Sequence, residues 1–268
     1  MGLERSEIQE VKQVIGEKAE PRILANSVPK AGTHLLEKCL FLFPGLSDSG
    51  IHVDMNLSPE ALRETLGKIE SGLFVSGHLP GSRFCIRLLQ ELGFKTFLII
   101  RDPRDVAVSH FHYVTKSTYH RLHDYYTRLP DDDVRLMASI RGFEEKLTEK
   151  RRIGRHDIKE FFRIFEPWFG EDINYVVRFE ALVGPKGGGS RDAQIQEIKR
   201  MAEHLDVNMS LAEIEDMAGG IFDQEAATFR KGMIGDWQNH FTSEHTRAFK
   251  EVAGQLLIEL GYEKDFDW

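Results

Sequence analysis

Short, mostly apolar runs alternate with longer amphipathic segments along the first two thirds of the chain. The apolar runs have the length of strands buried inside a parallel sheet, and they cover residues 22–28, 73–76, 95–100 and 174–178. Helical spacing with start and stop residues predicts helices at 33–43, 59–69, 82–92, 103–114, 133–150 and 157–169. Strands separated by helices predict an α/β fold with a central, mostly parallel sheet.

The last third of the chain has a mainly helical pattern. Helices are expected at 193–205, 210–217 and 244–260. The glycine-rich stretch 185–190 is interpreted as a surface turn rather than a domain linker. At 268 residues with 41% hydrophobic content, the chain can bury a substantial core. A single domain over 1–268 is therefore predicted, with residues 1–20 as a helical or flexible lead.

The charge balance excludes some classes of partner. A formal net charge of −8 argues against a general binder of nucleic acid or anionic membranes, because such proteins need an excess of Lys and Arg. No run approaches the roughly 18 apolar residues of a membrane span, and no apolar signal core follows Met1. A cytoplasmic protein is expected. The cysteines, Cys39 and Cys85, have no CxxC spacing and are expected to be buried free thiols.

The most informative segment is the turn between the first predicted strand and the helix that follows it. Small side chains at Ala31 and Gly32 let backbone N–H groups approach an anion, while Lys30 and Thr33 add a charge and a hydroxyl. The helix N-terminus adds the positive end of its dipole. The turn departs from the Walker A pattern, since Lys30 precedes the glycine. Taken alone, it is as readily an ordinary strand-to-helix turn as a phosphate site.

A second cationic segment begins where the strand at 95–100 ends. Arg101 is expected to face the crevice at the carboxyl ends of the strands, where α/β sheets bind ligands. Ser109, two turns into the next helix, can add a hydroxyl to an anion that Arg101 holds. Asp102 is expected to cap this helix and Arg104 to be solvated. An anion site at Arg101 and Ser109 is therefore predicted.

His78 stands just past the end of a predicted strand, a position that the ten other histidines lack. An imidazole with an ordinary pKa of about 6.5 suits general-base chemistry near neutral pH, so His78 is a candidate base. Four histidines crowd the segment after Arg101, at His110, His112, His120 and His123. Their spacing lacks a third metal ligand, and no metal site is expected.

A third cationic segment is formed by Arg230, Lys231 and Gly232, which offer two charges beside an approachable backbone. Lys30, Arg101 and this late segment are far apart in the sequence, yet each can reach one crevice at the sheet edge. A ligand with phosphates at both ends would explain all three segments.

Four segments, in the right order along the chain, resemble motifs of the cytosolic-type sulfotransferases. The run from Val28 to His34 resembles the family's PKSGTTW loop, and Ser76 to Pro80 resembles its THLP segment. Residues 101–109 match R(N/D)P(K/R)DVAVS almost completely, and residues 230–237 resemble RKGxxGDW. The resemblance implies a P-loop-NTPase-like three-layer fold. It also implies transfer of a sulfuryl group from 3′-phosphoadenosine 5′-phosphosulfate (PAPS) to a hydroxyl of a small or medium organic acceptor, which leaves 3′-phosphoadenosine 5′-phosphate (PAP).

The resemblance also implies roles for residues of this chain. It makes His78 the base that deprotonates the acceptor and Lys30 the cation that stabilises charge on the leaving phosphate oxygen, without a metal. The residues implied at the 5′-phosphate side are Lys30, Ala31, Gly32, Thr33 and His34. Those implied at the 3′-phosphate are Arg101, Ser109, Arg230, Lys231 and Gly232. Candidates for the adenine site, and equally for ordinary core residues, are Phe179, Phe222 and Phe229.

Several departures from the family pattern change what is expected. Leu35 stands where the family has a Trp and Phe179 where it has a Tyr, so adenine binding is expected to differ in detail. Ser76 stands where mammalian members often carry a Lys, which removes one transition-state cation. The family's dimer segment would fall at Gln238, Thr242, Ser243 and Arg247. Both of its charged ends are changed, so a monomer, or a dimer through another surface, is expected.

Two other functions stay open at this point. A P-loop-type nucleotide kinase would bind ATP with Mg²⁺, and the missing Walker lysine and acid count against it. A non-catalytic nucleotide-binding module would keep the fold without turnover. The acceptor is expected at 44–56 and 116–134, whose mixture of residues suits a phenol, a sugar, a lipid or a carrier-tethered chain. A solvated helical excursion explains 116–134 equally well.

Overall fold

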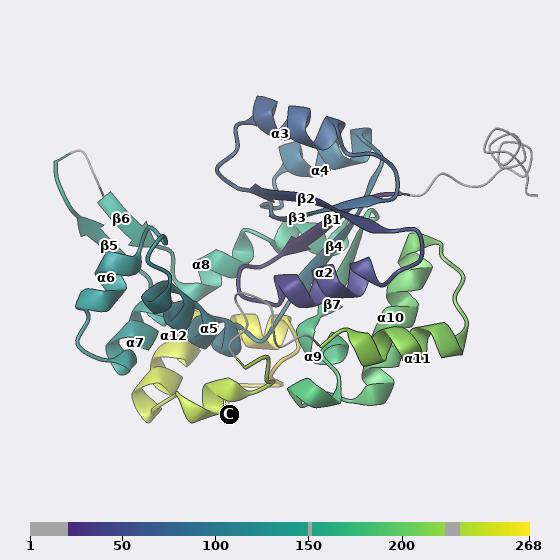
Figure 1. Cartoon of the computed structure of the whole chain (residues 1–268). Coiled ribbons are helices and arrows are strands. Elements are labelled where there is room, and N and C mark those ends of the chain that lie inside the picture. The colour runs from purple at the N-terminus through teal and green to yellow at the C-terminus, as the bar shows by residue number, and fades with distance from the viewer. Residues whose placement is uncertain (1–20, 150–151, 223–230) are drawn as a thin grey trace, which may run out of the picture.

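A five-stranded sheet forms the centre of the computed structural model, which describes residues 21–149, 152–222 and 231–268 (Figure 1). Its strands lie in the order β2 (Ser47–Asp54), β3 (Leu73–His78), β1 (Arg22–Ser27), β4 (Phe94–Ile100) and β7 (Asn174–Arg178). Every adjacent pair of these strands is parallel. The predicted α/β class with a central, mostly parallel sheet is confirmed.

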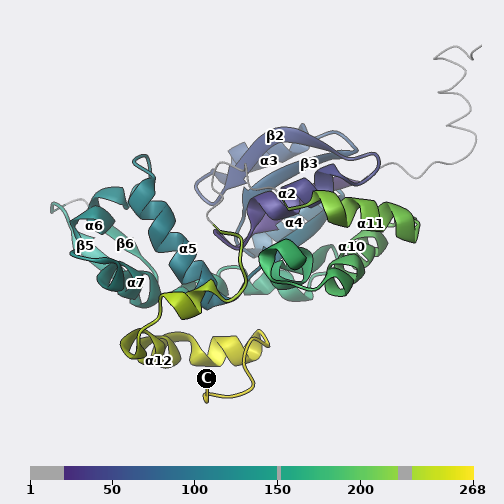
Figure 2. The same ribbon diagram turned by 60° about the horizontal axis from the view of Figure 1, so that its bottom comes forward.

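Alternate residues of the strands face two separate hydrophobic cores, because successive side chains of a strand point to opposite faces. Leu24 and Val75 belong to one core, and Ile23 and Phe74 to the other. The first core is covered by α3 (Pro59–Gly67), α4 (Arg83–Glu91), α5 (Pro103–Lys116), α8 (Ile158–Arg163) and α12 (Ser243–Glu259). The second is covered by α2 (Thr33–Phe41), α9 (Phe179–Leu182), α10 (Arg191–Leu205) and α11 (Leu211–Gly220). Helices on both faces of one sheet give a three-layer α/β domain (Figure 2).

The other described elements are short. Beside α5, at the left of Figure 1, lie α6 (His123–Arg128), α7 (Asp132–Arg141) and the antiparallel strands β5 (Phe143–Lys146) and β6 (Arg152–Arg155). Three 3₁₀ helices are η1 (Glu166–Gly170), η2 (Pro185–Gly187) and η3 (Asp236–Asn239). Across the described ranges, no helix is long and apolar enough to cross a membrane.

The helix predicted over 133–150 is wrong in its second half. The helix α7 ends at Arg141, and Gly142 follows with φ 68°, in the left-handed region that favours glycine. A Cβ atom at Gly142 would lie 2.5 Å from the carbonyl oxygen of Arg155, so the chain passes too close for any other residue. The following strand β5 is rich in Glu and Lys, which favour helices, and this composition explains the error.

Two further element predictions need correction. No strand was predicted where β2 lies, an edge strand in which Val53 is the buried residue and whose pairing with β3 shifts register between Asp48 and His52. An exposed, irregular strand carries little hydrophobic signal. The helix predicted over 157–169 ends at Arg163, and the chain continues in η1, where Pro167 lacks the N–H that a longer helix needs.

The parallel register brings the carboxyl ends of the strands to one edge of the sheet. Asp54 pairs with His78 and Ser27 pairs with Ile99. The buried Asn26 side chain donates from Nδ2 to the carbonyl oxygen of Leu79 at 2.9 Å and accepts from its N–H at 2.8 Å. These two bonds hold the end of β1 against the end of β3, and so fix His78 beside the turn that follows Ser27.

Candidate functional site

A cavity of about 1000 Å³ opens at this edge of the sheet. Most of the predicted site residues line it, although they come from separate segments: Lys30, Gly32, Thr33, His34, His78, Arg101, Ser109, Phe179, Phe222, Lys231 and Gly232. Ala31 is fully buried, and Phe229 and Arg230 lie outside the described residues. The fold therefore brings the described members of all four motif segments to one cavity.

The turn before α2 has the geometry of an anion cradle. Lys30 and Gly32 have φ of 73° and 116°, and the N–H of Ala31 donates to the carbonyl oxygen of Val28 at 2.9 Å. Thr33 opens the helix, so the first N–H groups of α2 have no acceptor within the helix. Exposed N–H groups at the positive end of a helix dipole stabilise a bound anion such as a phosphate.

The ring of His78 is held by Ser27. Its Nδ1 lies 3.0 Å from both the hydroxyl and the carbonyl oxygen of Ser27, and because the carbonyl can only accept, a proton on Nδ1 satisfies it. In the neutral ring Nε2 is then an unprotonated acceptor. Burial lowers the pKa of His78, and the nearby His52 and Lys30 lower it further, while the hydrogen bond to Ser27 opposes them. A neutral imidazole with a free lone pair is the form that a general base needs.

Arg101 is a buried cation at the end of β4, with 5% of its surface exposed. Its Nη2 donates to the carbonyl oxygen of Met233 at 2.6 Å and lies 3.2 Å from the Asp105 carboxylate. The guanidinium carbon lies 4.3 Å from the ring centroid of Phe179. The buried Nε makes no hydrogen bond with any described residue. A phosphate oxygen is an acceptor that fits such a donor, so this position suits an anionic group.

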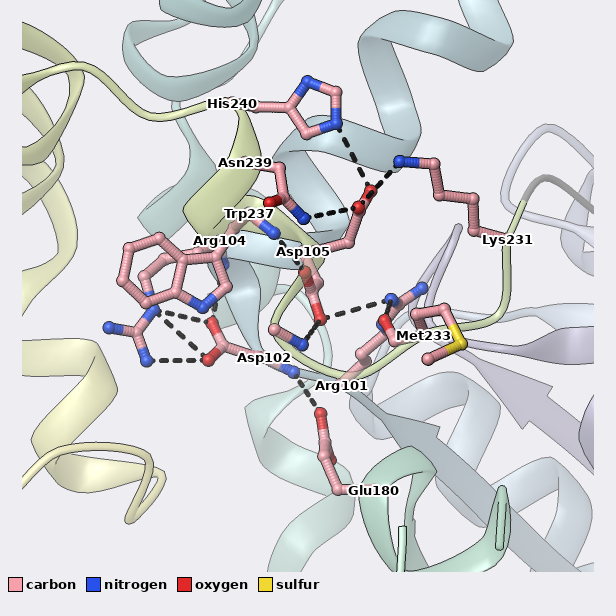
Figure 3. A network of polar contacts seen from close by, with 12 residues as sticks. Arg101, Asp102, Arg104, Asp105, Glu180, Lys231, Met233, Trp237, Asn239 and His240 are labelled. Carbon is pink, nitrogen blue, oxygen red and sulfur yellow. Dashed lines mark hydrogen bonds and ion pairs between the residues drawn. The ribbon is translucent and has the colours of Figure 1, made fainter. Parts of the chain in front are cut away.

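Gly235 and Trp237, which follow the third cationic motif, are hydrogen-bonded to the start of α5 (Figure 3). The Asp105 carboxylate accepts from the backbone N–H groups of Gly235 and Trp237, each at 2.9 Å. Burial raises the pKa of Asp105, while Arg101 and these two N–H groups act in the opposite direction. Lys231 Nζ lies 2.9 Å from Asp236 Oδ1. Asp105 therefore joins the Arg101 segment to the segment of Lys231, which are more than a hundred residues apart in the sequence.

Arg104 is buried rather than solvated, which corrects the prediction for this side chain. Asp102 caps α5 as expected, accepting from the N–H of Arg104 at 2.8 Å, and its carboxylate also pairs with the Arg104 guanidinium at 2.7 Å. The guanidinium carbon lies 4.1 Å from the ring centroid of Trp237 and 4.5 Å from that of Trp268. A second carboxylate, Glu263, lies 2.5 Å away. Arg104 thus links α5 to the C-terminal segment and is not part of the cavity lining.

His52 is a cavity residue that the sequence analysis missed. Its ring centroid lies 5.0 Å from that of His78, with the two rings at 73°, and its Nδ1 lies 2.9 Å from Ser76 Oγ. The available signal was the alternation of apolar Ile51 and Val53 around His52, which marks a strand. No strand was predicted at this position, so the sequence analysis did not foresee that β2 places a second imidazole beside His78.

The aromatic candidates differ in their surroundings. Phe179 is 4% exposed and packs against Gly32, where an added Cβ would lie 2.8 Å from Phe179 Cδ2. Phe222 is partly buried at the cavity, and Leu35, which stands where the resemblance has a Trp, also lines it. The described cysteines Cys39 and Cys85 are buried and free, as predicted. No group of three or more His, Cys, Asp or Glu side chains within the described residues is placed to hold a metal ion.

The fold and the cavity define an α/β protein with a phosphate-type turn, a neutral histidine and cations from distant segments at one sheet edge. No protein-family model matches the chain. It is 24% identical over 241 residues to Sulfotransferase 1B1 of Canis lupus familiaris, which covers 80% of this chain and 69% of that protein. This similarity in sequence agrees with the resemblance to cytosolic-type sulfotransferases that the four motif segments carry.

Solved structures extend the likeness of fold over most of both chains. The crystal structure of mouse sulfotransferase SULT7A1 complexed with PAP matches with a TM-score of 0.63 at 18% identity, covering 94% of this chain and 90% of that chain. Retinol dehydratase, in complex with androsterone and inactive cofactor PAP, matches with a TM-score of 0.56 at 15% identity, covering 93% and 84%. The P-loop-like three-layer fold expected from the motifs is confirmed.

Proposed function

We propose that the chain is a PAPS-dependent sulfotransferase that transfers a sulfuryl group to a hydroxyl of a small organic acceptor. The observation that carries the proposal is the meeting of His78, the Lys30 turn and Arg101 at one cavity, with Lys231 on the same lining. The similarity to named sulfotransferases, and to solved structures with PAP, supports it. The retinol dehydratase structure with androsterone supports a small-molecule acceptor.

The donor would be held at both of its phosphate ends. The N–H groups of Gly32, Thr33 and His34 at the start of α2, with Lys30, would bind the 5′-phosphate. Arg101, whose Nε has no acceptor among the described residues, would bind the 3′-phosphate with Ser109 and Lys231. Arg230 and Gly232 complete this group in the prediction from sequence. Phe222 and Phe179, which both line the cavity, remain candidates for adenine contact.

The bound donor supplies the sulfuryl group. His78 Nε2 accepts the proton of the acceptor hydroxyl as its oxygen forms a bond to sulfur and the sulfur–oxygen bond to the phosphate breaks. Lys30 stabilises the negative charge that develops on the phosphate oxygen. Transfers of this kind pass through a loose transition state, so positioning and charge stabilisation by these residues supply most of the acceleration.

Replacement of His78 by Ala tests the proposal directly. The variant should lower kcat by about 10²-fold or more with a verified acceptor, because it removes the proton acceptor. The assay follows transfer from labelled PAPS, and PAP affinity by calorimetry shows that the nucleotide site is intact. His156→Ala is the matched control, since His156 is exposed and lies outside the cavity lining. Transfer by the His78 variant at near wild-type rate would exclude His78 as the base.

The alternatives predict different ligands. A nucleotide kinase requires Mg²⁺-dependent ATP binding, whereas a non-catalytic module would bind PAP and transfer nothing to any acceptor. Incubation of the protein with labelled PAPS and an acceptor library, beside a parallel incubation with labelled ATP and Mg²⁺, separates the three functions. A cytoplasmic location and a monomer, or a dimer that avoids the family's dimer segment, remain predictions.

A further inference from the structure

His52 and His78 form a pair of imidazoles at the acceptor side of the cavity. Both side chains line the cavity, and they come from neighbouring strands whose register pairs His52 with Ser76 and Asp54 with His78. His52 is the more exposed of the two, so a bound molecule can reach its ring. The ring centroids lie 5.0 Å apart. One small molecule placed against His78 would therefore also meet His52.

The orientation of the His52 ring is held by Ser76. Burial works against ionisation of Glu37, yet hydrogen bonds from His34 and Ser76 hold its pKa below the usual value. Ser76 Oγ also lies 2.9 Å from His52 Nδ1, within hydrogen-bond distance. Either atom can donate, and in both cases Nδ1 is committed to Ser76.

The result is a second imidazole in a defined orientation. Within the described ranges His52 Nε2 has no hydrogen-bond partner, whereas its Nδ1 is committed to Ser76. His52 Nε2 can therefore form a hydrogen bond with a hydroxyl group, which both donates and accepts. Two ring nitrogens that each reach about 3 Å, on rings 5.0 Å apart, fit two hydroxyl groups on adjacent carbon atoms of one molecule.

The surroundings of the pair are also polar. Asp54 and Asn56 line the cavity at the end of β2, and Ser117 and Arg121 line it after α5. These side chains offer donors and acceptors on the lining of the same cavity. A flat, wholly apolar acceptor would leave them without hydrogen bonds, and desolvating unpaired polar groups is costly.

We propose that His52 is an acceptor-binding residue and that the acceptor carries a second hydroxyl adjacent to the one that is sulfated. The chemical class is a vicinal diol, as found in polyols and saccharides. This inference rests on the proposed sulfotransferase function. His78 takes the proton of the reacting hydroxyl, and His52 Nε2 forms a hydrogen bond with the neighbouring hydroxyl. Ser76 and Glu37 act through His52 as positioning residues.

A matched pair of acceptors tests this assignment. Wild-type protein should transfer sulfate from PAPS to cis-1,2-cyclohexanediol with a kcat/KM about tenfold or more above that for cyclohexanol, the effect of one additional hydrogen bond. His52→Ala should lower that ratio to about two, the value expected only because the diol carries two hydroxyls and cyclohexanol one. His52→Gln, which keeps a polar group at the end of the side chain, should restore part of it. Ser76→Ala should lower the ratio through a higher KM for the diol, because His52 loses the hydrogen bond that holds its ring.

The controls separate this inference from the proposed function. His156→Ala should keep the wild-type ratio, and calorimetric PAP affinity should be the same for wild type and His52→Ala. Wild-type protein that binds no PAP and transfers to neither acceptor contradicts the sulfotransferase itself. Wild-type protein that transfers to both acceptors with equal efficiency per hydroxyl, or a His52→Ala variant that keeps the preference for the diol, overturns only the role of His52.

Discussion

Replacement of Gly32 by Ala probes the phosphate turn at its most crowded point. Gly32 has φ 116°, which is unfavourable for L-residues. A Cβ atom there would lie 2.8 Å from Phe179 Cδ2 and 3.3 Å from Ile99 Cδ1. The Phe179 ring must therefore move, and the Arg101 guanidinium that lies 4.3 Å from its centroid must move with it. One added methyl group thus disturbs both proposed phosphate sites.

Two energetic terms set the expected size of the effect. A positive φ costs an L-residue about 1–2 kcal/mol, and overpacking costs about 1–3 kcal/mol. The free energy of unfolding should therefore fall by about 2–5 kcal/mol, which lowers the melting temperature by about 4–20 °C in a chain of this size. A displaced turn also weakens at least one charge-assisted hydrogen bond, so the Kd for PAP should rise about tenfold or more.

Gly93→Ala separates the two terms. Gly93 also has positive φ, 71°, but nothing lies within 4 Å of a Cβ built there, and the residue precedes β4 at the opposite edge of the sheet. This control should lose only the φ term of about 1–2 kcal/mol and keep the wild-type PAP affinity. Scanning calorimetry measures the melting temperatures and titration calorimetry measures Kd. If Gly32→Ala has the same melting temperature as Gly93→Ala and binds PAP with the wild-type Kd, the turn is neither crowded nor a phosphate cradle.

Three further predictions concern the cations and the base. Arg101→Lys keeps the charge but loses the planar fork, so the Kd for PAP should rise about tenfold in titration calorimetry, and an unchanged Kd would contradict the assignment. Arg230→Ala with Lys231→Ala should weaken PAP binding by on the order of 3 kcal/mol, the effect of two charge-assisted contacts, and retained affinity would exclude that segment from the site. Because burial, His52 and Lys30 lower the pKa of His78, its ring stays neutral down to below pH 6.5. The pH profile of kcat/KM should therefore fall only on the acid side of that value, and a midpoint above 6.5 would refute the role of His78 as a buried neutral base.

The central strands could be predicted from sequence because they are buried on both faces. β1 and β4 are buried over most of their length and contain the apolar runs Ile23–Ala25 and Phe97–Ile100, which are typical of interior strands. β2 gives a weaker signal, because an edge strand in which Val53 is the buried residue resembles a loop. The end of α7 was missed for another reason, since the turn at Gly142 depends on β6 packing against it. Local composition cannot reveal a contact between segments.

The difference between local sequence signals and contacts of distant segments also decides which site residues could be predicted. Lys30, His78 and Arg101 each lie at or just past the end of a strand, so parallel pairing alone predicts that they meet at one edge. His52 reaches that edge only because β2 pairs beside β3, and the sequence does not state which strands are neighbours. Arg104 was expected in solvent because Trp237 and Trp268, which enclose its guanidinium, lie more than a hundred residues away.

Helix α2 couples the two halves of the proposed site. Its first residues form the phosphate turn, and one turn later Glu37 binds His34 and Ser76, which in turn holds His52. A shift at the start of α2 therefore moves the donor cradle and the acceptor-binding histidine together. Gly32→Ala should accordingly lower both the affinity for PAP and the preference for a vicinal diol. His52→Ala should change the preference alone, because its ring lies at the far end of these contacts from the phosphate turn.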